Sequence, residues 1–184
     1  MFPRLEESTD VQERTVYLGS RACLKLAEGQ PQEALADSEA TIEAGRTLGI
    51  PFQAVKQGIF EAVEAAFALD QSAKIEELLT TIETVPPGSR PPYLDAQAKR
   101  FRARLAEDGA GYETAAEQFR ELALPFWLAV TLLEHGEWLV GHGLPTQAEP
   151  VLAEAGEIFE QLEARPWLER LAAAAGMQQP QVPA

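Results

Sequence analysis

The sequence is poor in the residues from which metal sites and nucleophilic active sites are usually built. Cys23 is the only cysteine among 184 residues, which excludes an intramolecular disulfide and a cysteine metal cluster. We expect it to be a small buried residue on the first helix. His135 and His142 are the only histidines. Their separation on one helix corresponds to about 10 Å of rise, whereas helical zinc ligands lie three or four residues apart. We therefore expect no metal, no cofactor and no enzymatic activity.

Long hydrophobic runs are also missing. No stretch approaches the roughly 18 uninterrupted apolar residues that a membrane helix needs. The opening segment MFPRLEESTD has early acidic residues and no apolar core segment, unlike a signal peptide. These observations favour a cytoplasmic protein without a membrane partner.

Basic residues are scarce, with 15 Lys and Arg against 29 Asp and Glu and a net charge of −14. This balance argues against nucleic-acid binding, because phosphate contacts need a basic surface. It favours a protein or peptide partner that is basic or of mixed charge. The balance reverses locally, where five basic residues face only Asp95. These five are Arg90, Lys99, Arg100, Arg102 and Arg104.

No run of alternating β-branched residues predicts a strand. A proline followed by an aromatic residue instead occurs four times, at proline intervals of 41, 33 and 41 residues. The four pairs are Pro51-Phe52, Pro92-Tyr93, Pro125-Phe126 and Pro166-Trp167. Proline is tolerated in the first turn of a helix, where its missing N–H has no partner to lose. Each pair therefore predicts the start of a helix, and the spacing predicts a repeat.

Apolar residues at helical spacing follow each start, and each stripe ends at a turn before a second helix. Gly29, Gly109 and Gly143 are suited to the left-handed position that closes a helix. Pro150 is expected to bend the last second helix or to delay its start. The sequence thus predicts an all-α, antiparallel helix-pair solenoid with about four repeats. We interpret residues 1–175 as a single domain. It comprises repeats at about 8–48, 51–86, 91–123 and 125–163 and a capping helix at 166–175. A flexible tail at 176–184 follows the domain. The loop-rich stretch 85–92 is interpreted as a kink between repeats.

Two segments, "GQPQEAL" (29–35) and "GLPTQAEPVLAEA" (143–155), resemble the turn and second helix of a tetratricopeptide repeat. In that family a small residue on the first helix faces an alanine on the second. The matching pairs here are Gly136 with Ala148, Ala22 with Ala34 and, in a bulkier form, Val63 with Ile75. The resemblance implies a superhelix whose first helices line a concave groove.

Residues 126–170 resemble the C-terminal repeats of MalT-like, LuxR-type bacterial regulatory ATPases and of ATPase-coupled nucleotide cyclases. In those proteins the repeats act as a sensor or docking arm. This chain has no G-x-x-x-x-G-K-[ST] phosphate loop. The resemblance therefore implies the arm without the ATPase.

Five residues are the candidate groove residues: Gln97, Arg100, Arg104, His135 and Trp138. Arg100 and Arg104 lie on one flank of a helix, where they could clamp a carboxylate or phosphate. The alternative is a solvated face paired with neighbouring acidic residues. Trp138 is expected to project into the groove. The other aromatic residues of the last third either form a pocket or pack repeat against repeat.

The predicted function is non-catalytic binding of a peptide, a partner helix or another domain in a bacterial signalling or transcription-regulatory system. Two alternatives stay open. One is a small-molecule sensor arm of a regulatory ATPase, in which an effector occupies the groove and changes the curvature of the repeats. The other is a scaffold that self-associates through its end repeats.

Overall fold

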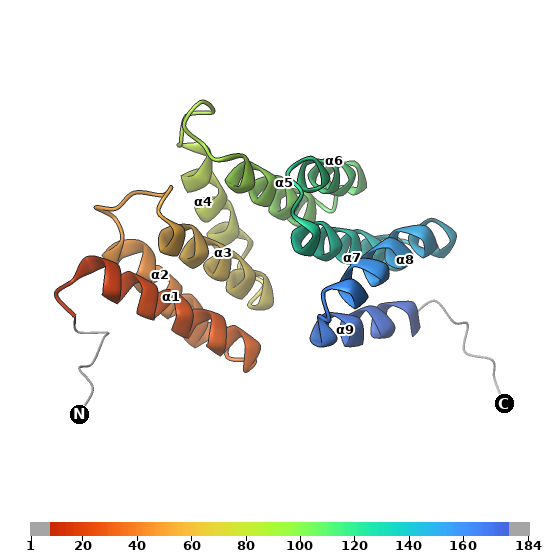
Figure 1. Cartoon of the computed structure of the whole chain (residues 1–184), viewed down its shortest axis with the longest axis horizontal. Coiled ribbons are helices and arrows are strands. Elements are labelled where there is room, and N and C mark those ends of the chain that lie inside the picture. The colour runs from red at the N-terminus through yellow and green to blue at the C-terminus, as the bar shows by residue number, and fades with distance from the viewer. Residues whose placement is uncertain (1–7, 177–184) are drawn as a thin grey trace. The chain divides into compact units, whose positions relative to one another are not determined.

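The computed structural model describes residues 8–176, and all regular secondary structure in this part of the chain is helical (Figure 1). Its nine helices are α1 (Val11–Ala27), α2 (Pro31–Ala44), α3 (Gln53–Ala68), α4 (Ser72–Glu83), α5 (Pro92–Ala106), α6 (Gly109–Glu121), α7 (Pro125–Gly141), α8 (Pro145–Gln161) and α9 (Arg165–Gly176). Helices pack against their neighbours in sequence order. The predicted all-α class is therefore confirmed. None of the described helices is both long and apolar enough to cross a bilayer.

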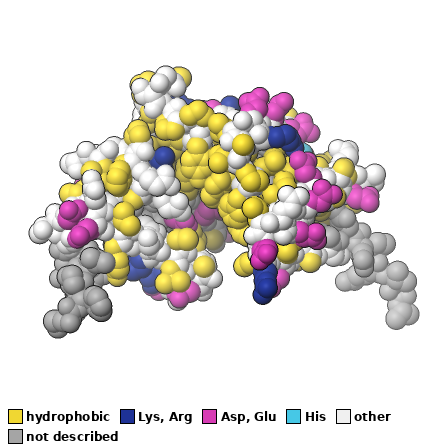
Figure 2. Space-filling view, viewed as in Figure 1, with side chains coloured by type: hydrophobic (Ala, Val, Ile, Leu, Met, Phe, Trp, Pro, Cys, Tyr) yellow, Lys and Arg dark blue, Asp and Glu magenta, His cyan; other side chains and the backbone are white. Residues whose placement is uncertain are grey.

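The chain divides into two compact units, with the boundary between Asp95 and Ala96 inside α5. Unit 1 is described over residues 8–95 and unit 2 over residues 96–176. Figure 2 shows that carboxylate side chains are more frequent than basic ones on the face in view, in line with the net charge of −14.

In unit 1, α1 packs on α2 and α3, α2 packs on α3, and α3 packs on α4. Ala22 of α1 and Ala34 of α2 are fully buried. Gly58 of α3 lies close to α2, since a Cβ atom there would be only 2.7 Å from the Thr41 Cγ2 atom. Small residues at these positions allow the backbones to approach.

In unit 2, α7 packs on α6, α8 and α9, and α8 packs on α9. Gly136 marks the closest approach of α7 and α8, because an added Cβ would be 2.3 Å from Leu152 Cδ2. Phe126 makes an edge-to-face contact with Trp167 at 5.6 Å between ring centroids, and Trp167 stacks on Phe159 at 5.7 Å. These aromatic residues pack α7, α8 and α9 together, as one of the two sequence interpretations predicted.

Most prolines start helices as predicted. Pro92 and Pro125 are the first residues of α5 and α7, and Pro166 is the second residue of α9. The prediction is wrong for Pro51, because Phe52 adopts an extended conformation (φ −66°, ψ 133°) and α3 begins one residue later. The predicted delay at Pro150 is wrong, because α8 starts at Pro145 and runs through this residue, and the predicted bend stays a prediction.

Left-handed residues close several helices. Gly29 and Gly143 have φ values of 71° and 73°, as their positions predicted. Gly109 was expected to do the same but is the first residue of α6. Asp108 caps that helix, because its carboxylate accepts a hydrogen bond from the Ala110 N–H at 3.1 Å. The left-handed position falls instead on Glu107, with φ 51°.

Candidate functional site: a charged cleft in unit 2

The five predicted site residues all lie in unit 2, on two helices. Gln97, Arg100 and Arg104 belong to α5, and His135 and Trp138 belong to α7. They surround a carboxylate that the sequence analysis did not single out, Glu134 of α7.

Arg100 forms a buried, bidentate ion pair with Glu134. Its Nε donates to Oε2 at 2.7 Å and its Nη2 donates to Oε1 at 2.6 Å. The Gln97 Oε1 atom accepts a third hydrogen bond from Arg100 at 3.1 Å. Arg100 is 1% exposed and Gln97 is 0% exposed. Arg100 thus binds a carboxylate of the chain itself, and the clamp on a partner's carboxylate or phosphate stays a prediction. Neither residue is open to solvent, so the alternative interpretation is right that Arg100 pairs with an acidic residue but wrong that its face is solvated.

Arg104 extends this ion pair to the surface. Its Nη1 atom lies 3.5 Å from Glu134 Oε1, and its side chain is 30% exposed while that of Glu134 is 3% exposed. Two guanidinium groups therefore share one carboxylate. This arrangement compensates the cost of burying Glu134 and fixes its orientation.

His135 and Trp138 belong to a row of rings beside the ion pair. Tyr112 stacks on His135 at 5.6 Å between centroids, and Trp138 lies 4.2 Å from His142. Burial lowers the pKa of His135, an effect that the nearby carboxylate of Glu113 partly opposes. Burial likewise raises the pKa of Tyr112. Both rings are therefore neutral at pH 7.

Trp138 packs its six-membered ring on Gly109 of α6, where an added Cβ would lie 2.7 Å from the ring. Its indole N–H is buried and has no hydrogen-bond acceptor. Trp138 lines the cleft described next, whereas His135 is 6% exposed and lies behind it.

A cleft of about 330 Å³ opens where α5, α7 and α9 meet. Arg104, Glu134, Glu137 and Arg170 contribute charged groups to it from three successive first helices of the helix pairs. Arg170 pairs with Glu137 through two hydrogen bonds, Nε to Oε1 at 2.8 Å and Nη2 to Oε2 at 2.5 Å. The cleft therefore brings two cations and two carboxylates together, and the carboxylate of Glu107 also lines it. We call Arg104, Glu134, Glu137 and Arg170 the charged row.

Neither glutamate of the charged row was among the predicted site residues. The signal was nevertheless present, because each pairs with an arginine about one repeat length away. Arg100 and Glu134 are 34 residues apart, and Glu137 and Arg170 are 33 residues apart. An opposite-charge pair at the repeat distance is what adjacent equivalent helices would juxtapose.

Two other expectations concern cysteine and metal. Cys23 is exposed rather than buried, so that prediction is wrong. Its thiol hydrogen-bonds to Glu61 of α3, and burial, followed by the Glu61 charge, raises the pKa of the thiol. Within residues 8–176, no group of three or more His, Cys, Asp or Glu side chains is arranged to hold a metal ion.

No protein-family model matches this chain, and no curated protein sequence matches it.

Proposed function

We propose that the protein is a non-catalytic interaction module, a tetratricopeptide-like helical repeat that binds a peptide segment or partner helix of mixed charge in the unit 2 cleft. The observation that carries this proposal is the charged row. Side chains from α5, α7 and α9 meet there, and the two glutamates are held in fixed positions by arginines. Such a surface offers preformed partners for both signs of charge, which favours specificity in binding.

The spacing of ion pairs supports the repeat assignment. Besides the two pairs in the cleft, Arg120 of α6 donates to Glu154 of α8 at 2.6 Å, and these residues are 34 residues apart. Three links thus join equivalent helices at a nearly constant interval of one tetratricopeptide length. The first helices are linked to first helices, and second helices to second helices.

The chemistry of the cleft supports binding over catalysis. Glu134 and Glu137 each accept two hydrogen bonds from one arginine, so their carboxylate oxygens are already engaged within the chain. His135 is buried, and its lowered pKa keeps the ring neutral at pH 7. A general base needs access to substrate and a pKa near the working pH. From the resemblance of residues 126–170 to the repeat arms of bacterial regulators, we further propose that the protein acts as a docking arm in a cytoplasmic regulatory system.

The test is a selection of displayed peptides on the immobilised full-length chain, followed by calorimetry with the selected peptides. We expect peptides that carry both acidic and basic residues. The double variant Arg104→Ala/Arg170→Ala removes the two partly exposed cations of the charged row. Its affinity should fall about tenfold, the loss expected for one or two charge-assisted contacts.

Arg120→Ala is the matched control, because it removes the same kind of inter-repeat ion pair from the second helices, outside the cleft. Its affinity should equal that of the original chain. Equal affinity for the control and the double variant would reject the cleft as the binding site. A rise in melting temperature with a nucleotide or sugar would favour the sensor alternative, and concentration-dependent light scattering would favour the scaffold.

A further inference from the structure

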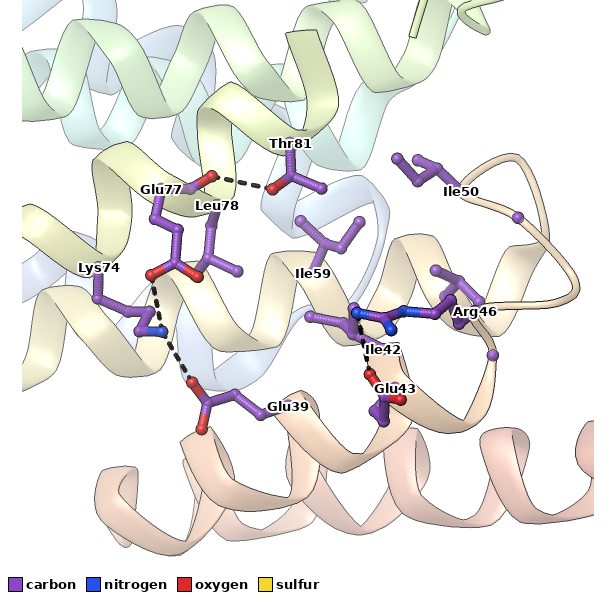
Figure 3. Close-up of a pocket in the computed structure, with 13 residues that line it drawn as sticks. Glu39, Ile42, Glu43, Arg46, Ile50, Ile59, Lys74, Glu77, Leu78 and Thr81 are labelled. Carbon is purple, nitrogen blue, oxygen red and sulfur yellow. Dashed lines mark hydrogen bonds and ion pairs between the residues drawn. The ribbon is translucent and has the colours of Figure 1, made fainter. Parts of the chain in front are cut away.

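Unit 1 contains a second and larger cleft, of about 610 Å³, that plays no part in the proposed function. It lies between α2 and α4, over α3, and the loop 45–52 closes one end (Figure 3). In contrast to the unit 2 cleft, its walls are second helices of the helix pairs. Its volume is in the range of ligand-binding clefts.

The floor of this cleft is apolar. Val55 and Ile59 of α3 are 2% and 0% exposed and form its base, with Leu78 of α4 at 6%. Ile42 and Ile50 are half-buried and project toward it from α2 and from the loop (Figure 3). A partner side chain that covered Ile42 and Ile50 would remove their remaining apolar surface from water.

Acidic side chains outnumber basic ones on the rim. Glu39, Glu43 and Glu77 line it, with side chains 48%, 69% and 65% exposed. The two basic residues of the rim are Lys74 and Arg46, and the Arg46 Nη2 atom lies 3.4 Å from the Glu43 carboxylate. The helix α2 contains four acidic residues and no basic residue, and α4 contains three glutamates and one lysine. With three carboxylates against Arg46 and Lys74, the rim carries a net negative charge beside an apolar floor.

Lys74 shows where this rim accepts a cation. Its ammonium group lies 2.9 Å from the Glu77 carboxylate and 3.0 Å from that of Glu39, so it spans the cleft between α4 and α2 (Figure 3). The hydrogen bonds to Glu77 and Glu39 raise the pKa of Lys74 above its ordinary value. The position between these two carboxylates is thus a favourable one for an ammonium or guanidinium group.

We propose that the α2–α4 cleft is a second docking site, which takes a basic amphipathic segment of a partner protein. Large apolar side chains of the segment cover Ile42 and Ile50, and its lysines or arginines pair with Glu39, Glu43 and Glu77. Charge complementarity selects this occupant, because an acidic or neutral apolar segment would leave the rim carboxylates without new partners.

The probe is a synthetic peptide of about 18 residues with leucines at i, i+3, i+4 and i+7 and lysines on both flanks. Binding to the full-length chain is measured by calorimetry. The variant Glu43→Lys/Glu77→Lys should weaken binding about tenfold, because two exposed ion pairs are lost and like charges replace them. Glu76→Lys is the control, since Glu76 is exposed on the same helix but does not line the cleft. It should change affinity by less than about twofold.

Lys74→Ala tests the same site with an expected change in affinity of the opposite direction. Removing the resident ammonium group frees Glu39 and Glu77 for the peptide, and affinity should rise about threefold. Lys25→Ala makes the same change in net charge at the Glu33 pair outside the cleft, and it should leave affinity nearly unchanged. Serine in place of the peptide leucines should abolish binding.

Equal effects of the cleft variants and their controls would overturn the proposal, because binding would then reflect only the net charge of −14. Full affinity of the serine peptide would also overturn it. The outcome is independent of the unit 2 site, since Arg104→Ala/Arg170→Ala leaves this cleft intact.

Discussion

At the scale of single residues, Glu61 of α3 is a carboxylate poorly suited to its surroundings. It is 9% exposed, and burial raises its pKa above the ordinary 4.5. The Gln57 side-chain amide and the Cys23 thiol hydrogen-bond to it, and these contacts partly oppose that rise. A raised pKa in the folded state means that Glu61 favours folding when protonated. This contribution is complete below pH 4.5 and is lost as the pH rises through the folded-state pKa.

We therefore expect Glu61→Gln to stabilise the protein at neutral pH by about 1 kcal/mol, because the neutral amide avoids the cost of burying a charge. The gain should shrink toward zero below pH 4.5, where Glu61 is protonated in both states. Thermal denaturation of both proteins from about pH 4 to about pH 8 measures this difference. Glu157→Gln, at an exposed position of α8, is the control and should show little change at any pH.

The same substitution has a second readout at Cys23. The Glu61 charge contributes to raising the pKa of that thiol. Removing this charge should therefore increase the fraction of Cys23 that is ionised to thiolate at about pH 8. Alkylation of the only cysteine by iodoacetamide should then be faster in Glu61→Gln. An unchanged alkylation rate would show that burial alone controls the thiol.

At the scale of helices, close crossings depend on residues without a side chain. Gly136 of α7 faces Leu152 of α8, and an added Cβ would lie 2.3 Å from its Cδ2 and 2.5 Å from its Cγ. Gly156 of α8 also faces a leucine, Leu171 of α9, but an added Cβ there would lie at an ordinary contact distance of 3.7 Å. The two glycines therefore differ in the space available and share the same helical context.

Gly136→Ala should destabilise unit 2 by about 1 to 3 kcal/mol, because Leu152 must move or α7 and α8 must separate. Gly156→Ala should instead stabilise it by up to about 1 kcal/mol, the usual gain of alanine over glycine inside a helix. Chemical denaturation of both variants measures the two free energies of unfolding. Stabilisation by Gly136→Ala would contradict the close crossing.

Helix positions were predictable from sequence because their signals are local. A proline at the first position of a helix affects only its first turn, and apolar residues at helical spacing mark one face of one helix. The helices α5 and α7 begin at Pro92 and Pro125 as predicted. Pro51 shows the limit of that rule. The extended conformation of Phe52 belongs to the loop 45–52, whose path depends on tertiary packing.

The charged site was predictable only in part, for a related reason. The charge of Arg100 and its place on α5 follow from the sequence, but its burial depends on Glu134 from another helix. A single sequence shows that both charges exist without showing that they meet. The exposure of Cys23 was missed for the same reason, since helix position alone does not identify the buried face.

At the scale of the whole molecule, the described part of unit 2 has a regular set of links between helix pairs. Arg100–Glu134, Arg120–Glu154 and Glu137–Arg170 each join residues 33 or 34 positions apart. They differ in burial, since the side chains of Arg100 and Glu134 are 1% and 3% exposed, and those of Arg120 and Glu154 are 52% and 43% exposed. These ion pairs, although equally spaced along the chain, should therefore differ in their contribution to the free energy of unfolding.

Arg100→Ala should destabilise the protein by about 3 to 5 kcal/mol, because it leaves most of the charge of Glu134 buried without its bidentate partner. Arg120→Ala should cost at most about 1 kcal/mol, as is typical of exposed ion pairs. Urea denaturation measures both values. The Arg100→Met/Glu134→Leu double variant should recover much of the loss, because it removes both charges together. No recovery would mean that Arg100 acts through packing instead of charge.

The Arg100–Glu134 pair also constrains how this protein can change over generations. Replacing either residue alone leaves an unpaired charge in the interior, whereas replacing both together leaves none. Among descendants of a common ancestor, the residues at positions 100 and 134 should therefore be substituted together, whereas those at positions 120 and 154 should be substituted independently.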